Sequence, residues 1–290
     1  MTDAPIDLRD MTRLDDCRAV VGVQETVWGR DGETVPASVL FVSAKRGGIL
    51  IGAYRGSSLV GFVWSLRGVR EGVATHWSHM LGVMPESRNQ GVAERLKWAQ
   101  RARALAAEVE LIEWTFDPLQ APNAHFNLRV LGAIGATYTE NAYGPLAGPL
   151  HRGTPTDRIT VEWRIAEPHV LGRLARRQTP DAKLVVRTAD ALTAPDAIRT
   201  TVRGWWTEVS GVRPDLTEPQ IRVSIPPKFS EMQRDETELA LVWREATREV
   251  MTSLFQRGYL AVDFSLDRQT GGGAYLFAIS PELVSSRLGA

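Results

Sequence analysis

Apolar residues in the first half of the chain alternate between helical spacing and strand spacing, and this alternation limits the folds open to it. They recur at helical spacing over residues 14–28, whereas 49–54 and 59–66 are apolar, β-branched runs on either side of a short polar turn. A long helical stretch over 91–109 follows a strand pattern at 75–83. The alternation predicts an α/β fold. The same reasoning predicts helices at 36–44, 123–131, 168–177 and 236–257, and strands at 6–9, 110–116, 136–143, 159–165, 183–187, 221–225, 259–266 and 274–279.

A run rich in glycine and proline at 144–149 predicts a connection between two domains, 1–148 and a C-terminal α/β domain 149–290. Both halves contain a strand, a proline, a helix that carries a tryptophan (Trp98 or Trp243) and another strand, in that order. This order has two interpretations. The second half is either a diverged repeat of the first, or it shows an order that any α/β half can give.

Composition excludes several classes of protein. Lys plus Arg and Asp plus Glu both number 34, so the basic excess typical of chains that grip nucleic acid is absent. A single cysteine, Cys17, excludes an intramolecular disulfide and a cysteine-rich zinc site. The polar N-terminus lacks the apolar segment of a signal peptide, and no apolar run has membrane-spanning length. We therefore expect a cytoplasmic protein that binds neither nucleic acid nor membrane.

Metal and hydrolase chemistry have little support in the sequence. His76 and His79 are three residues apart on a predicted strand, so their side chains are expected on opposite faces. We expect no metal site. The Gly-x-Ser-x-Gly motif of a serine hydrolase elbow is also missing from the sequence.

The most informative stretch is 81–93, between a predicted strand and a long helix. It contains Arg88-x-x-Gly91-x-Ala93. Unpaired N–H groups and the dipole at a helix N-terminus attract anions, Gly91 and Ala93 leave the backbone accessible, and Arg88 adds positive charge. A pyrophosphate would fit this loop, although an ordinary strand-to-helix turn is the alternative. Neither a Gly-x-Gly-x-x-Gly nor a P-loop motif is present.

With the helices and hairpin before it, this stretch resembles the GNAT N-acetyltransferase superfamily. The resemblance lies in Val83-x-Pro85, in Arg88-x-x-Gly91-x-Ala93 and in the later Asn123 with Leu131-Gly132-Ala133, and covers about residues 5–145. The whole chain resembles a little-characterised bacterial branch with an extra C-terminal region. The resemblance implies a mixed, mostly antiparallel sheet flanked by helices, with strands that splay near 75–83. The second half is expected to be α/β as well, and a diverged GNAT-like repeat is one interpretation of it.

The resemblance also implies a co-substrate, acetyl-CoA, held by the domain 1–148. The strand residues Leu81, Gly82 and Val83 would bind the pantetheine arm, and Asn123 would lie near it. The amides that would hold the pyrophosphate are those of Arg88, Asn89, Gln90, Gly91, Val92 and Ala93. One departure matters: Leu128 stands where many members have a tyrosine that acts as general acid, so that role is unassigned.

Candidate acids and bases come from residues predicted on neighbouring strands. His79 and Glu113 are candidates for the base, and Tyr138 and Tyr143 for the acid. His76, Asp117 and His125 are further candidates, and each has a structural interpretation as well. The pair Trp205-Trp206 either lines an acceptor pocket or packs in the core. Arg244 and Arg248 either bind an acidic acceptor or form a solvated face with Glu245 and Glu249.

These features predict an acyl-CoA-dependent N-acyltransferase that moves an acetyl group to a primary amine of a small molecule or peptide. One alternative is a non-catalytic acyl-CoA sensor. Another is a tRNA-dependent aminoacyl ligase with tandem GNAT-like halves, which the neutral charge disfavours. Whether the chain forms a homodimer is left open.

Overall fold

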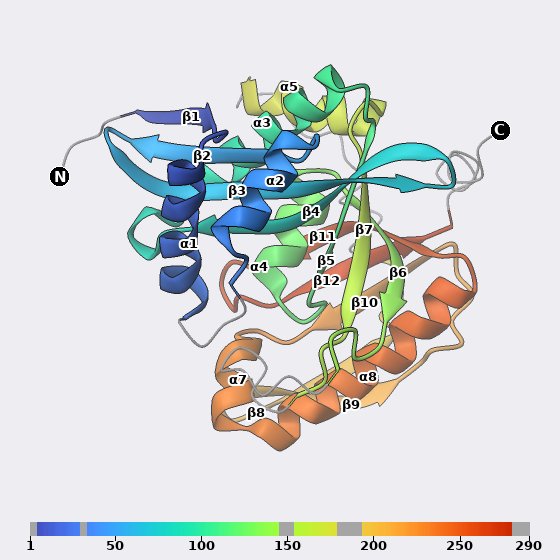
Figure 1. Cartoon of the computed structure of the whole chain (residues 1–290). Coiled ribbons are helices and arrows are strands. Elements are labelled where there is room, and N and C mark those ends of the chain that lie inside the picture. The colour runs from blue at the N-terminus through green and yellow to red at the C-terminus, as the bar shows by residue number, and fades with distance from the viewer. Residues whose placement is uncertain (1–4, 30–33, 145–153, 179–192, 280–290) are drawn as a thin grey trace. The chain divides into compact units, whose positions relative to one another are not determined.

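The computed structural model describes residues 5–29, 34–144, 154–178 and 193–279 (Figure 1). Contacts divide the chain into two compact units, which we describe separately. The first comprises residues 1–114 and 164–171, and the second comprises 115–163 and 172–290. The predicted connection at 144–149 lies almost wholly outside the described residues. The predicted domains 1–148 and 149–290 therefore stay a prediction, which the contacts do not test.

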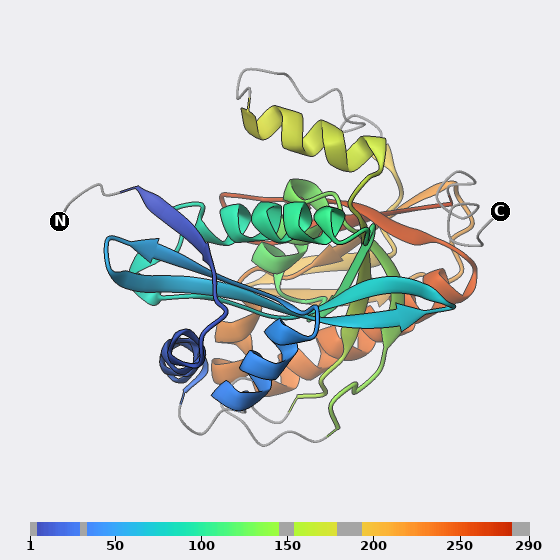
Figure 2. The ribbon, with the colours of Figure 1, turned by 45° about the horizontal axis from the view of Figure 1, so that its top comes forward.

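In the first unit a five-strand sheet has the order β1-β2-β3-β4-β5, antiparallel throughout except for β4 and β5, which run parallel. The strands are β1 (Ile6–Asp10), β2 (Ile49–Arg55), β3 (Ser58–Arg70), β4 (Val73–Val83) and β5 (Leu111–Phe116), whose first four residues belong to this unit. Helices α1 (Leu14–Trp28) and α2 (Ala37–Lys45) lie on one face, and α3 (Val92–Ala106) lies on the other (Figure 2).

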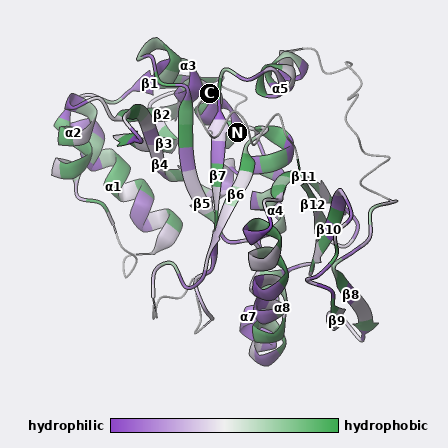
Figure 3. Ribbon diagram, turned by 90° about the vertical axis from the view of Figure 1, so that its right-hand side faces the viewer, coloured by the Kyte–Doolittle hydropathy of each residue, from purple (hydrophilic) through white to green (hydrophobic). Residues whose placement is uncertain are grey.

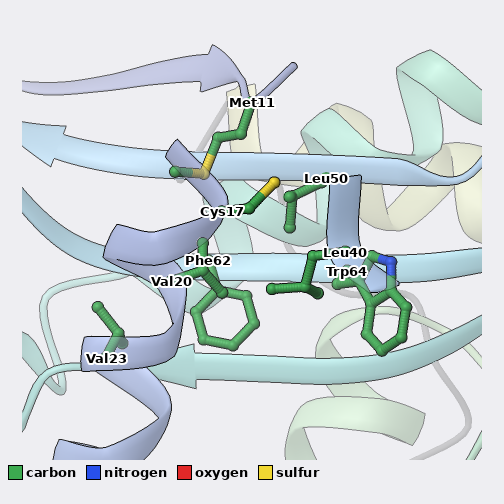
Figure 4. Close-up of a cluster of buried hydrophobic side chains, with 8 residues drawn as sticks. All are labelled: Met11, Cys17, Val20, Val23, Leu40, Leu50, Phe62 and Trp64. Carbon is green, nitrogen blue, oxygen red and sulfur yellow. The ribbon is translucent and has the colours of Figure 1, made fainter. Parts of the chain in front are cut away.

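The apolar sides of α1 and α2 form the core on their face of this sheet. Cys17, Val20 and Val23 of α1 and Leu40 of α2 pack with side chains from the strands and the β1–α1 turn: Met11, Leu50, Phe62 and Trp64 (Figure 4). All eight are at most 5% exposed, and burying such a side chain stabilises a fold by roughly 1.5–3 kcal/mol. Burial also raises the pKa of the Cys17 thiol, which makes it a packing residue rather than a reactive one.

In the second unit the strand order is β7-β6-β11-β12-β10, and every adjacent pair is antiparallel. The strands are β6 (Ile134–Thr139), β7 (Arg158–Arg164), β10 (Gln220–Ile225), β11 (Leu260–Leu266) and β12 (Gly273–Ala278), and β8 (Ile198–Arg203) pairs separately with β9 (Trp206–Val212). The helices are α4 (Ala121–Ala124), the π-helical turn η2 (His125–Val130), α5 (Pro168–Gln178), α7 (Phe229–Asp235) and α8 (Thr237–Gln256). Along α8 hydrophobic and hydrophilic residues alternate in the manner of a helix with one packed face (Figure 3).

The architecture confirms the predicted mixed α/β class, with a mostly antiparallel sheet flanked by helices. Two predicted elements need correction, and a hairpin and a helix were missed. The helix expected at 123–131 is a four-residue α-helix followed by a π-helical turn, and the strand expected at 136–143 ends at Thr139. The hairpin β8–β9 and helix α7 were not expected. The strand expected at 183–187 lies outside the described residues.

Candidate functional site

Strands β4 and β5 separate soon after they meet. Their parallel pairing is limited to His76 with Ile112 and Trp77 with Glu113, whereas β4 stays paired with β3 up to Val83. This confirms the predicted splay. Between Ser78 and Val83 the edge of β4 that would face β5 therefore has backbone N–H and C=O groups that β5 does not use, and such an edge can bind an extended ligand.

A β-bulge lies at the start of this open edge. Trp64 pairs with Met80 and Ser65 pairs with Ser78, which leaves His79 as the extra residue of β4. The His79 side chain is exposed and meets the Trp64 ring edge-on, with 5.1 Å between ring centroids. Because Trp64 belongs to the core on the α1 and α2 face, the bulge directs His79 towards that face.

The loop after β4 turns sharply into α3. Its backbone is left-handed at Asn89 and at Gly91, with φ of 60° and 74°, and a Cβ at Gly91 would meet no atom within 4 Å. Gly91 is the N-cap of α3, and no side chain caps this end of the helix. The first N–H groups of α3 are thus not used by a cap, and the helix dipole adds partial positive charge there.

Side chains of the loop hold its shape. Arg88 Nε donates to the carbonyl oxygen of Val83 at 3.2 Å, and Gln90 Nε2 donates to that of Glu86 at 2.9 Å. The Arg55 guanidinium donates to Gln90 Oε1 at 2.5 Å. Arg55 and Arg88 therefore bring two guanidinium charges to a loop that is already favourable for anions.

The glycine before the loop has a packing role. A Cβ at Gly82 would lie 2.9 Å from Phe62 Cε1 and 3.1 Å from a ring carbon of Trp28. Only glycine therefore lets α1 pack this closely on the end of β4.

Of the predicted site residues, the first unit brings together the splayed strand (Leu81, Gly82, Val83), the loop (Arg88 to Ala93), His79 and Glu113. Glu113 forms an ion pair with Arg70, at 2.6 Å between Nη1 and Oε1, and its side chain is 13% exposed. Because Glu113 is mostly buried and already paired with a guanidinium, the exposed His79 is the better placed candidate for the base.

Sequence reasoning missed a buried polar cluster beside the splay. The Lys97 ammonium group on α3 lies 3.1 Å from Ser78 Oγ, 2.7 Å from Gln100 Oε1 and 3.7 Å from the centre of the Trp114 ring. Burial lowers the pKa of Lys97 well below its usual value. Ser78 and Trp114 directly follow the last paired residues of β4 and β5, so the cluster lies where the two strands part. The signal in the sequence was a lysine between Leu96 and Trp98, both of them buried.

His76, one of the further candidates, is a structural residue. It is fully buried, and its Nδ1 lies 3.1 Å from Ser65 Oγ. Burial, reinforced by the positive charge of Arg67, lowers the pKa of His76 to about 4. A histidine in this environment is neutral at pH 7 and holds the strand pair together.

The other predicted residues belong to the second unit. Tyr138 donates to Asp157 Oδ2 at 2.7 Å, and burial together with that carboxylate raises the pKa of Tyr138 far above its usual value. Tyr143 is half-exposed, with its hydroxyl 3.1 Å from Thr115 Oγ1. Asn123 is exposed, and Leu128 is fully buried as a packing residue.

Buried ion pairs correct the interpretation of the arginines on α8. Arg244, 1% exposed, forms two hydrogen bonds of 2.8 Å to Asp117, and Arg248 holds Asp157 in the same two-point manner. Arg244 therefore does not belong to a solvated face, whereas the Arg248 side chain is 28% exposed. Each arginine is paired with a carboxylate of this unit, so neither is free for an acidic acceptor. Asp117 also caps its own loop by accepting from the Leu119 N–H at 2.9 Å, which is the structural interpretation of that residue.

The tryptophan pair also needs correction. Trp205 lies at the tip of the β8–β9 hairpin and is 97% exposed. It therefore lines no pocket in this unit and packs in no core. Trp243 on α8, in contrast, is fully buried and donates to the Thr207 carbonyl oxygen at 2.7 Å.

Among the described residues, no group of three or more His, Cys, Asp or Glu side chains is arranged to hold a metal ion. Within the same residues, none of the helices has the length and apolar character needed to cross a bilayer.

Comparison of the chain with known proteins found matches among solved structures. No protein-family model matches the chain, and no curated protein matches it. The similar solved structures include an acetyltransferase of the GNAT family from Streptococcus pneumoniae, with 14% identity, a TM-score of 0.44 and coverage of 55% of this chain and 98% of that one.

The descriptions of two further similar structures name a ligand or a substrate. The NatC complex bound to Gag peptide and CoA gives 12% identity, a TM-score of 0.45 and coverage of 55% of this chain and 98% of that one. An aminoglycoside acetyltransferase from an uncultured soil metagenomic sample gives 14% identity, a TM-score of 0.36 and coverage of 39% and 78%.

Proposed function

We propose that the chain is an acyl-CoA-dependent N-acetyltransferase that transfers acetyl from acetyl-CoA to a primary amine of a small molecule or peptide. The observation that carries the proposal is the junction of the open β4 edge with the uncapped N-terminus of α3. The open β4 edge is suited to an extended amide-containing arm, and the uncapped N-terminus of α3 is suited to a pyrophosphate. Acetyl-CoA presents both groups in one molecule.

The residues of the loop fit the co-substrate. The amides from Arg88 to Ala93 would donate to the pyrophosphate oxygens, with the Arg88 and Arg55 guanidiniums adding charge. The backbone of Leu81, Gly82 and Val83 would bond to the amides of the pantetheine arm. Such contacts bind the thioester and an acceptor in one geometry, and positioning alone can supply a large part of the rate.

In the chemical step the amine nitrogen would attack the thioester carbonyl carbon. The C–S bond then breaks, the acetyl group stays on nitrogen, and the thiolate takes a proton to leave as CoA. We propose His79 as the base that removes the proton of the amine, because the bulge exposes its ring at the open edge. A backbone N–H of the bulge would stabilise the developing oxyanion.

We propose that one of two tyrosines is the general acid. Tyr138 and Tyr143 keep the roles expected from sequence, and Tyr143 is the stronger candidate because the Tyr138 hydroxyl is already committed to Asp157. Glu113 is kept as the second candidate base, to be tested beside His79.

The first experiment separates an enzyme from a sensor. The full chain is incubated with acetyl-CoA labelled in the acetyl group and with a panel of small-molecule and peptide amines. We expect transfer of label to an amine. CoA binding without transfer to any amine would favour the acyl-CoA sensor, and failure to bind CoA would contradict both functions.

The second experiment assigns the acid and the base. Transfer rates across pH are compared for His79→Ala, Glu113→Gln, Tyr138→Phe and Tyr143→Phe, with Tyr54→Phe on β2 as the matched control. Loss of a true acid or base lowers the rate by roughly 10²–10⁴-fold and removes one limb of the pH profile. If all four variants keep wild-type rates and profiles, the assignments are wrong and positioning alone accounts for the rate.

A further inference from the structure

Away from the loop, the second unit gathers several arginines around one carboxylate. Arg129 of η2 forms an ion pair with Asp263 Oδ2 on β11 at 2.5 Å, and Arg173 Nη2 of α5 lies 4.0 Å from the other oxygen. Asp263 Oδ1 also accepts from the Phe264 N–H at 2.9 Å. One carboxylate thus serves two guanidiniums and a backbone donor.

Two donor or acceptor atoms of this cluster are buried without a hydrogen-bond partner among the described residues. They are Arg173 Nη1 and His125 Nδ1, and the Arg173 side chain is only 11% exposed. A buried guanidinium N–H that bonds to nothing is costly, because it has lost its hydrogen bonds to water. The geometry therefore leaves an unused buried donor beside the cluster.

The pKa shifts of this cluster reflect the positive charges that surround Asp263. Burial lowers the pKa of Arg173, Asp263 raises it, and Arg129 and Arg176 lower it. The pKa of Arg176 is lowered by burial and by Arg129, and that of His125 is lowered by burial, Arg129, Arg268 and Arg173. Several positive charges therefore act on one another around Asp263, and a bound anion would relieve their repulsion.

We propose that Arg129, Arg173 and Arg176 form an oxyanion-binding site, specific for a phosphate group, that is separate from the loop at Gly91. Arg173 Nη1 would donate to the phosphate, and its neighbours would supply charge and further donors. The phosphate could belong to free inorganic phosphate or to a phosphorylated small molecule. The inference concerns the second unit alone and does not rest on the proposed transferase activity.

Phosphate binding to the full chain tests the site by isothermal titration with inorganic phosphate. Arg173→Gln should weaken binding by about tenfold, because it removes one charge-assisted hydrogen bond and its charge. Asp263→Asn should tighten binding, because it removes the competing carboxylate and keeps an oxygen that can accept from Arg129. Opposite effects from two neighbouring residues are not expected of a merely structural cluster.

A control and a competition experiment complete the design. Arg203→Gln removes an arginine that is 82% exposed on β8, so it should leave phosphate affinity unchanged. Competition of inorganic phosphate with phosphoserine and with a sugar phosphate distinguishes free phosphate from a phosphorylated ligand. Absence of phosphate binding to the wild-type chain, or equal affinity for wild type and folded Arg173→Gln, would overturn the proposal.

Discussion

His76 and Lys97 are both basic side chains that the first unit buries with hydrogen bonds to hydroxyl groups. His76 lies beside Ser65, and Lys97 lies beside Ser78. Burial lowers the pKa of each, so their charged forms are disfavoured in the folded chain. The stability of this unit is therefore coupled to pH through these two side chains.

The lowered pKa of His76 determines the direction in which stability changes with pH. Its pKa is about 4 in the folded chain and 6.5 when unperturbed, so the unfolded chain binds the proton first. The stabilisation is fully present above about pH 6.5 and is lost as pH falls towards about 4, and it amounts to at most about 3 kcal/mol. Urea unfolding of wild type and His76→Gln should show the wild-type advantage shrinking between about pH 7 and about pH 4.5.

An NMR titration of the histidine ring protons provides the direct check. Titration of His76 near 6.5 in the folded chain, or an advantage over His76→Gln that stays constant across this pH range, would contradict the account.

Among the elements, those that bury one face were predictable from sequence and those that do not were missed. Helix α1 begins and ends where predicted, because its apolar residues face a core and Gly29 ends it at a φ of 89°. Strand β8 has one buried residue, Ile198, and five exposed ones, so it carries no hydrophobic period to detect. The hairpin was therefore not predicted, and neither was the exposed position of the tryptophan at its tip.

The candidate site likewise contains features that were predictable from the sequence and features that were not. The loop 88–93 was predictable because its chemistry depends on backbone conformation, which Gly91 reveals in the sequence. The bulge at His79 and the ion pair of Glu113 depend on strand register, and the Lys97 cluster depends on which face of α3 is buried. Strand register and the choice of the buried helix face are set by packing between elements, which cannot be read from a single sequence.

Trp205 and Trp243, two of the tryptophans of the second unit, should respond oppositely to truncation. Trp205→Ala at the hairpin tip should change the free energy of unfolding by less than about 0.5 kcal/mol, because the ring is in solvent. Trp243→Ala should cost about 3–5 kcal/mol, since it leaves a cavity and an unpaired carbonyl at Thr207. Urea unfolding measures both, and a large loss for Trp205→Ala would show that the hairpin tip is packed.

For the chain as a whole, the two units differ in the segment that connects a strand to the next helix. In the first, β4 leads through a glycine-bearing loop to α3, a helix of 15 residues with an uncapped N-terminus. In the second, β10 leads through Pro226 and Pro227, which have no backbone N–H, to α7, a helix of seven residues. No glycine occurs between Pro226 and Glu236. The connection from β10 to α7 therefore lacks the donors and the backbone freedom of a pyrophosphate loop.

We accordingly expect one CoA per chain. Native mass spectrometry of the full chain with excess CoA should show a single added molecule, removed by Gly91→Glu. A second CoA that persists in the Gly91→Glu variant would mean that the other unit has its own CoA site, and the difference drawn between the units would be wrong.

The central claim is that the loop at Gly91 binds the pyrophosphate of CoA, and titration calorimetry of CoA with Gly91→Glu tests it most directly. The matched control is Gly72→Glu in the β3–β4 turn, where φ is also left-handed, at 81°, and where a Cβ likewise meets nothing within 4 Å. Both variants suffer the same backbone strain, but only Gly91→Glu puts a carboxylate in the loop. We predict wild-type CoA affinity for Gly72→Glu and none detectable for Gly91→Glu; equal affinity in two folded variants would contradict the account.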